Sequence, residues 1–176
     1  MKVIFLDIDG VLNSGYTKEK IEGYTFVDAS NIRFLKELID QTGAKVVLSS
    51  TWRRGWELLD TRDEESLTSS EKRDIRLFEA LRARLLEHGI ELMSYTRDFA
   101  QRGTEIDAWL NEWTGEPIEA FVILDDMDDW ELKPHGDHLV QTGFYAGLEP
   151  KHVRRAINIL EKRSGLLRSN HDERRV

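Results

Sequence analysis

The chain of 176 residues contains no cysteine. Disulfide bonds, thiolate metal sites and cysteine nucleophiles are therefore excluded together. The sequence also lacks an apolar run of the roughly 18 to 20 residues that a membrane-spanning helix requires, and it contains no internal repeat or low-complexity tract. The length suits one sizeable core, which predicts a single domain over residues 1–162. The polar, arginine-rich tail over residues 163–176 is expected to be disordered.

The charge of the chain is unbalanced towards acid. Asp and Glu number 33 against 25 Lys and Arg, which gives a formal net charge of -8. Such a surface repels polyanions and membranes on average, although a local basic groove for nucleic acid can lie on an acidic protein. The apolar run Val3–Leu6 near the N-terminus is too short for the core of a signal peptide. We therefore expect a cytoplasmic protein with no membrane partner.

Short apolar runs alternate with helical patterns along the chain. Val3–Leu6, Lys45–Leu48 and Ala120–Leu124 are typical of strands buried on both faces of a parallel sheet. Ile90–Met93 and His138–Gln141 predict two further short strands.

Four helices are predicted between and after these strands. They are expected from Ser30, as the N-cap, to Gly43; from Ser70 to Gly89; over Thr104–Trp113; and onward from Pro150. Strands that alternate with helices predict an α/β fold with a doubly wound, Rossmann-like parallel sheet.

Polar side chains follow three of the apolar runs directly. These are Asp7 with Asp9, then Ser49-Ser50-Thr51, then Asp125-Asp126. They are expected to converge, because the carboxyl ends of parallel strands meet at one edge of the sheet. Gathered carboxylates repel one another unless a cation compensates them or some remain protonated. Mg²⁺ fits best, since it binds through a few carboxylates, water and substrate phosphate.

At these positions the sequence resembles the haloacid dehalogenase (HAD) superfamily. Phe5–Val11 (Phe-Leu-Asp-Ile-Asp-Gly-Val) resembles its first motif, Val46–Ser49 its second and Val122–Asp126 its fourth. Arg102–Ile106 is the best match to the third motif, a cation ahead of a helix. The resemblance implies a Mg²⁺-dependent phosphatase on the family's Rossmann-like core.

A narrower resemblance points to one branch of this superfamily. Gly10–Asn13, Ser49–Arg53 and Arg102–Leu110 are similar to a small branch associated with nucleic-acid repair proteins. This resemblance implies a phosphorylated substrate, with a polynucleotide end as a candidate.

The resemblance assigns roles to individual acids. Asp7 would be the nucleophile that forms an aspartyl-phosphate, and Asp9 would protonate the leaving oxygen and later activate water. Asp125 and Asp126 would hold the metal together with Asp7 and the backbone carbonyl of Asp9. In this family an acid at position 9 favours phosphatase over dehalogenase chemistry.

The resemblance also implies a set of phosphate contacts. Ser49 would hydrogen-bond the phosphoryl oxygens, with Ser50 as the alternative, and Arg102 would neutralise their charge. Arg97 and Lys133 are the alternatives to Arg102.

Trp52 and Arg53 allow two interpretations. As an aromatic and basic pair they would stack a base and contact phosphate. Alternatively, Trp52 packs against the helix after the second strand and Arg53 pairs with an acid.

The resemblance also bears on the size of the substrate. A cap domain is expected to be minimal or absent, because Ser14–Asp28 is at most a flap. An open site suits polynucleotide ends or phosphoproteins, and a small-molecule phosphatase is the alternative. A phospho-accepting receiver domain, from another class of protein, is a distant alternative. A receiver domain has its paired acids early in the sequence and its phospho-acceptor later, which is the reverse of the order in this chain.

Overall fold

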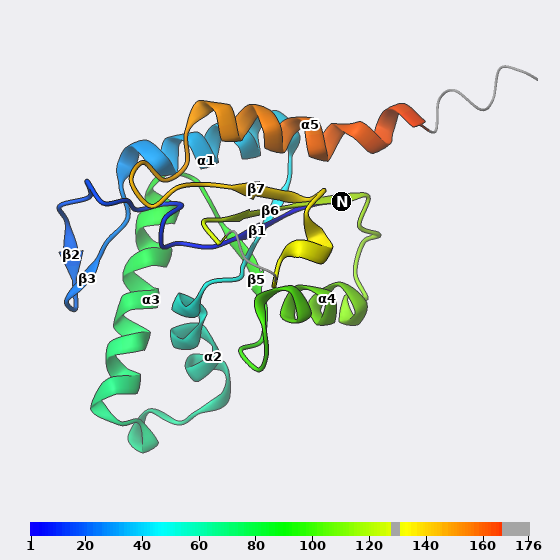
Figure 1. The fold of residues 1–176 in the computed structure, drawn as a ribbon. Helices are drawn as coiled ribbons and strands as arrows, with labels where there is room; N and C mark the ends of the chain where they lie inside the picture. Colours follow the sequence, from blue (N-terminus) through cyan, green and yellow to red (C-terminus); the bar gives the residue numbers. More distant parts are fainter. Residues whose placement is uncertain (128–130, 167–176) are drawn as a thin grey trace, which may run out of the picture.

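The structure, a computed structural model, describes residues 1–127 and 131–166 (Figure 1). Its centre is a five-stranded sheet in the order β5-β4-β1-β6-β7, and every strand pair is parallel. The predicted doubly wound α/β fold is confirmed. The strands are β1 (Lys2–Leu6), β4 (Lys45–Leu48), β5 (Leu92–Tyr95), β6 (Ala120–Asp125) and β7 (Leu139–Gln141).

Helices cover both faces of this sheet. In Figure 1, α1 (Ala29–Thr42) and α5 (Pro150–Leu166) lie above it and α4 (Arg102–Glu112) lies below. The helices α2 (Arg54–Thr61) and α3 (Ser69–Glu87) pack on each other. Within the described residues, no helix is both long and apolar enough to span a membrane.

The alternation of side chains along the strands produces two cores. The larger core joins the α1 and α5 side of the sheet to α3, and it includes Ile4 and Leu6. The smaller core contains Val3 and Phe5 on the α4 side. Because successive residues of a strand point to opposite faces, a residue at position 7 follows Val3 and Phe5 onto the α4 face.

Several helices begin at other residues than predicted, because their N-caps are not the residues expected from the sequence. The N-cap of α1 is Asp28, whose side chain accepts from the N–H of Ser30, so Ser30 is inside the helix and not its cap. The N-cap of α3 is Thr68, which forms a reciprocal capping box with Glu71, and the predicted cap Ser70 is helical. α4 begins at Arg102, two positions before the predicted start at Thr104.

The predicted strand at Ile90–Met93 is also shifted. After α3, the N–H of Ile90 still donates to the carbonyl of Leu85, in the manner of a helix C-cap with Gly89 in the left-handed region. The backbone is therefore free to pair with β4 only from Leu92.

Two elements were not predicted from the sequence. The expected flap contains a hairpin of β2 (Lys20–Ile21) and β3 (Tyr24–Thr25). The second is α2, which follows a 3₁₀ helix over Thr51–Arg53. Short 3₁₀ helices also occur over Glu64–Ser66 and Lys133–His135.

The C-terminal helix α5 continues to Leu166, past the expected domain end at residue 162. Residues 167–176 of the predicted tail lie outside the described residues.

Candidate active site

The site lies where the order of strands reverses. From β1 the chain builds β4 and β5 on one side, then crosses to β6 and β7 on the other. Asp7 follows β1, and its N–H donates to the carbonyl of Leu124 at 2.9 Å. The N–H of Ser49 donates to the carbonyl of Leu6, also at 2.9 Å. The ends of β4, β1 and β6 are thus in register, at the kind of crevice where α/β sheets bind ligands.

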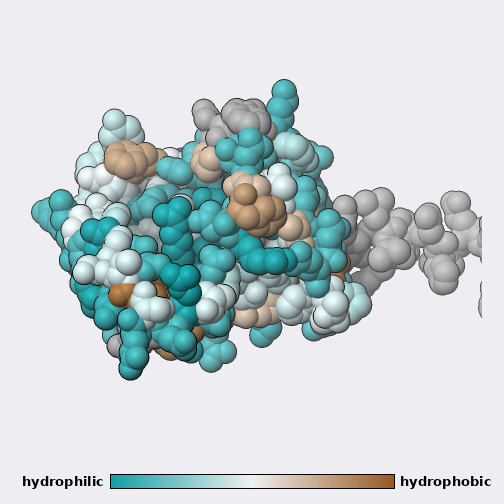
Figure 2. All heavy atoms as spheres, turned by 90° about the horizontal axis from the view of Figure 1, so that it is seen from below, coloured by the Kyte–Doolittle hydropathy of each residue, from teal (hydrophilic) through white to brown (hydrophobic). Residues whose placement is uncertain are grey.

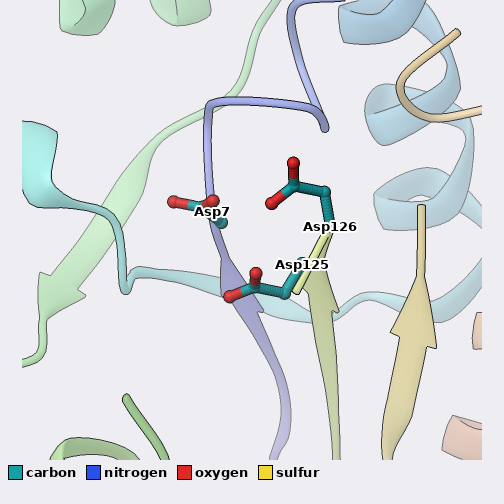
Figure 3. Close-up of side chains that lie close together, drawn as sticks. All are labelled: Asp7, Asp125 and Asp126. Carbon is teal, nitrogen blue, oxygen red and sulfur yellow. The ribbon is translucent and has the colours of Figure 1, made fainter. Parts of the chain in front are cut away.

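Three carboxylates meet at this edge. Asp7, Asp125 and Asp126 each offer an oxygen within 4.8 Å of the others, and Figure 3 shows the three side chains around one space. Asp7 and Asp125 are buried and Asp126 is half-buried. Gly10 makes room for this group, because a Cβ at this position would lie 2.3 Å from Oδ2 of Asp126. Its φ of +69° also favours glycine.

Arg102 is the cation at this group. Its Nη1 lies 2.7 Å from Oδ2 of Asp125 and 3.3 Å from Oδ1 of Asp7. As the first residue of α4, it is aimed at the face onto which Asp7 projects. Of the two alternatives considered from the sequence, Arg97 forms an ion pair with Glu112 away from the acids, and Lys133 is exposed at the start of a 3₁₀ helix.

One arginine does not balance the three clustered acids. Burial raises the pKa of Asp7 against the opposing charge of Arg102. Burial, with the nearby charge of Asp7, raises the pKa of Asp125 to about 7. Burial and the charges of Asp7 and Asp9 also raise the pKa of Asp126. A compact set of carboxylate oxygens with excess negative charge fits a hard divalent cation such as Mg²⁺.

Asp9 lies apart from the three-acid group. Its carboxylate is exposed, and it accepts from Nδ2 of Asn13 at 2.8 Å and from Nε1 of Trp52 at 3.0 Å. Asn13 in turn accepts from the N–H of Gly10 at 2.9 Å, so the loop and the acid are held together. Two N–H donors therefore fix the direction of the Asp9 carboxylate, and the contact of its backbone carbonyl with a metal stays a prediction.

The two candidate serines differ in their contacts. Both are fully buried. The hydroxyl of Ser50 lies close enough to the Asp7 carboxylate to oppose in part the rise of the Asp7 pKa that burial causes. The hydroxyl of Ser49 has no hydrogen-bond partner within residues 1–127 and 131–166. Ser50 is thus in direct contact with the predicted nucleophile, and Ser49 carries an unsatisfied polar atom beside it.

The prediction that Arg53 contacts phosphate does not fit the structure. Its side chain is only 2% exposed, and its Nη2 lies 2.7 Å from Oε2 of Glu105. Its Nη1 donates to the carbonyl of Ser49 at 2.9 Å. The alternative interpretation, that Arg53 pairs with an acid, describes its position. Trp52 is likewise buried and stacks on Phe26, so it does not offer a free face to a base.

Three residues of the site were not assigned a role from the sequence. Asn13 holds Asp9, Thr142 donates from Oγ1 to the carbonyl of Gly10 at 2.7 Å, and Glu105 pairs with Arg53. Asn13 carried a signal, because an Asn shortly after Asp-x-Asp-Gly is typical of a side chain that caps its own turn. Glu105 and Thr142 carried none, since their partners are far away in the sequence.

Residues 3–153 match the family described as the HAD domain in Swiss Army Knife RNA repair proteins. The chain belongs to this family. No curated protein matches the chain. Membership makes this HAD domain a hydrolase of the phosphatase or phosphoesterase type, and HAD domains generally use Mg²⁺. Between β1 and β4 it carries the β2–β3 hairpin and α1, and between β4 and β5 it carries α2 and α3, so within the described residues no separate cap domain covers the acids.

Proposed function

We propose that the protein is a Mg²⁺-dependent phosphomonoesterase that works through an aspartyl-phosphate on Asp7 and acts on phosphorylated polynucleotide ends. One observation carries the chemistry. The Asp7 carboxylate lies at the switch point of the sheet, among the oxygens of Asp125 and Asp126 and 3.3 Å from the Arg102 guanidinium. A nucleophile beside a fixed cation is what phosphoryl transfer requires.

In the first step an Asp7 oxygen attacks phosphorus and the ester P–O bond breaks. Asp9, in its acid form, gives its proton to the leaving oxygen, which departs as an alcohol. Arg102 stabilises the negative charge that is spread over the phosphoryl oxygens, and Ser50 donates a hydrogen bond beside Asp7.

In the second step Asp9, now a carboxylate, takes a proton from water as the water attacks the phosphoaspartate. Inorganic phosphate leaves and the Asp7 carboxylate is restored. The donors Asn13 and Trp52 hold the Asp9 carboxylate in a fixed position for both proton transfers. A Mg²⁺ held by Asp7, Asp125, Asp126 and the Asp9 carbonyl would neutralise charge on the transferred group.

Three observations support a macromolecular, polar substrate. The family is described by its occurrence in RNA repair proteins. The described part of the chain also has no cap domain over the acids. The face that carries α2, α3 and α4 is mainly hydrophilic and has only small, separate hydrophobic patches, which suits a polar ligand in an open site (Figure 2).

The test is a comparison of substrates in the presence of Mg²⁺. We expect a 5′- or 3′-phosphorylated oligonucleotide to be hydrolysed with higher kcat/KM than the matching mononucleotide or a sugar phosphate, because remote contacts contribute to the transition state. Asp7→Asn is the matched control and should remove the activity on all of them. If mononucleotides or sugar phosphates are preferred at every salt concentration, the protein is a small-molecule phosphatase instead.

A further inference from the structure

A small hollow opens beside Asp9, and none of the three clustered acids lines it. It has a volume of about 90 Å³ and is lined by Asp9, Tyr24, Trp52, Arg54 and Asp74, among others. The hollow thus brings together the hairpin, the start of α2 and the first turns of α3. In the proposed reaction Asp9 protonates the leaving oxygen, so the group attached to that oxygen has to lie against the Asp9 carboxylate. The hollow is therefore in the position of the leaving group.

The floor of the hollow is held rigidly. Gly55 lets α2 approach α3 so closely that a Cβ on it would lie 2.2 Å from the carbonyl oxygen of Asp74. This contact fixes the backbone of Asp74 relative to Arg54, which precedes Gly55 on α2. Arg54 is tied further by a hydrogen bond from its Nε to Oδ2 of Asp98 at 2.8 Å. The polar groups in the hollow are thus preorganised before any ligand binds.

The wall of the hollow is the β2–β3 hairpin, docked on α3. Arg76 binds Glu22 at the hairpin turn through two hydrogen bonds of 2.8 and 3.1 Å. The guanidinium of Arg73 lies over the Tyr24 ring, 5.7 Å from its centroid. Tyr24 nevertheless remains 43% exposed. The aromatic ring is therefore held in place and still available to a ligand.

Asp74 has unused hydrogen-bonding capacity. Arg54 lies close enough to Asp74 for the charge of Asp74 to raise the pKa of Arg54. Within the described ranges, however, the Asp74 carboxylate forms no hydrogen bond and no ion pair within 4.0 Å. A carboxylate accepts only, so its complement is a ligand that donates. Asp74 lines the same hollow as Tyr24, which offers an apolar ring face. A ring with an apolar face and hydroxyl donors at its edge matches both groups.

We propose that this hollow binds the sugar ring of the leaving group, with Asp74 as the acceptor for a ribose hydroxyl. The inference rests on the proposed phosphatase function and deepens it. The size of the hollow favours one sugar ring over a whole nucleoside, because pockets for larger ligands usually measure about 300–1,000 Å³. Tyr24 supports the ring face, and the base and the rest of the strand extend into solvent past the hairpin.

The experiment compares oligoribonucleotides with a terminal phosphate, at the 3′ or 5′ end, with the same strands carrying a single 2′-deoxyribose at the phosphorylated nucleotide. All assays contain Mg²⁺, and p-nitrophenyl phosphate reports phosphatase activity that needs no sugar. We expect wild type to prefer the ribose substrate by about tenfold in kcat/KM, the effect of one hydrogen bond to a charged acceptor. Asp74→Ala should reduce this ratio to about one.

Matched variants separate the contact from a fold defect. Glu79→Ala removes an exposed carboxylate from the same helix, outside the residues that line the hollow, and should leave the ratio at its wild-type value. Asp74→Asn keeps an acceptor oxygen and should retain part of the preference.

The outcomes distinguish the two proposals. Equal kcat/KM for ribose and deoxyribose in wild type, or an unchanged ratio in Asp74→Ala, overturns the sugar subsite while the phosphatase assignment stands. A wild-type protein that hydrolyses none of these substrates, p-nitrophenyl phosphate included, overturns the proposed function and the subsite with it.

Discussion

Two charge clusters lie next to each other and differ in balance. Around Asp7, three carboxylates share one guanidinium, that of Arg102. Behind them, Arg53 is paired with Glu105 at 2.7 Å and lies 3.3 Å from Asp98, which also binds Arg54. The second cluster has a cation for each acid and is complete. The first has more acids than cations, and burial, together with neighbouring carboxylates, raises the pKa of Asp7 and Asp125, so this cluster suits a positive ligand.

The balanced cluster also supports the unbalanced one. Arg53 donates to the carbonyl of Ser49, next to the hydroxyl that contacts Asp7. Glu105 accepts from the N–H groups of Phe99 and Ala100, each at 3.1 Å, and so fixes the loop before Arg102. The comparison teaches that burial of charge alone does not mark a reactive site. A reactive site is instead indicated by buried acids at the ends of the strands that lack enough neighbouring cations to balance their charge.

The largest expected effect is on the unbalanced cluster. Asp7→Asn removes the attacking charge with little change of shape, so kcat should fall at least about a thousandfold. The metal-free melting temperature should stay the same or rise, because repulsion among the acids decreases. Steady-state assays and thermal melts measure both. Residual turnover above background in Asp7→Asn would remove Asp7 from the mechanism.

The two arginines should respond in opposite ways. Arg102→Ala should lower kcat by roughly a hundredfold to a thousandfold, since it removes charge stabilisation from the transition state. Arg53→Ala should instead destabilise the fold by about 3–5 kcal/mol, because it leaves Glu105 buried without its cation. Denaturant unfolding measures the stability of both variants, and steady-state kinetics measures their kcat.

A double variant tests whether the Arg53–Glu105 pair is structural. Arg53→Met with Glu105→Leu replaces both partners by apolar side chains and should recover most of the lost stability. If Arg53→Ala unfolds at the wild-type denaturant concentration but loses affinity for substrate, Arg53 belongs with the phosphate contacts after all.

The acid cluster should make stability depend on pH and Mg²⁺ together. The raised pKa values of Asp7, Asp125 and Asp126 mean that the metal-free native state binds more protons than the unfolded chain between about pH 4 and pH 7. The stability contributed by these groups is therefore present at low pH and is lost as pH rises through about 7, the pKa of Asp125.

Mg²⁺ should reverse this loss, since it binds the ionised carboxylates of the native state only. The melting temperature should rise with Mg²⁺ by several degrees at about pH 8 and much less at about pH 5. Asp126→Ala should reduce the shift at the higher pH. An equal shift in that variant would place Asp126 outside the metal site.

The smallest effect is expected at Trp52. Trp52→Phe keeps an aromatic ring against Phe26 and removes the hydrogen bond to Asp9, which should lower kcat about five- to tenfold. As a positioning residue it should matter less for p-nitrophenyl phosphate, whose leaving group needs no protonation. An equal loss on both substrates would indicate a packing defect rather than a loss of Asp9 alignment.

The sequence indicated those site residues whose position follows from a local pattern in the chain. Asp7 and Asp125 stand out because each ends a buried apolar run, and parallel strands bring such ends together. Arg53 and Trp52 were ambiguous because both follow a strand and enter a 3₁₀ turn, where the direction of a side chain is decided by tertiary partners. Arg53 turns inward for Glu105, which lies 52 positions away in the sequence.

The same reason explains what was missed in the fold. α2 has eight residues, too few for a helical period to be distinct, and it is stabilised by the close approach of Gly55 to α3. The hairpin has strands of two residues each and depends on ion pairs from Arg76 and Arg84. Neither element carries a local signal as strong as the long apolar strands.

The central claim, that Asp7 forms a covalent phosphoaspartate, is tested most directly by the intact mass of acid-quenched protein. Asp9→Asn, given Mg²⁺ and p-nitrophenyl phosphate, should accumulate the intermediate because its leaving group departs unaided while water is no longer activated. We expect one added phosphoryl group, located on Asp7 by peptide mapping and absent in Asp7→Asn. Turnover in wild type with no such adduct in Asp9→Asn, or an adduct on another residue, would contradict the account.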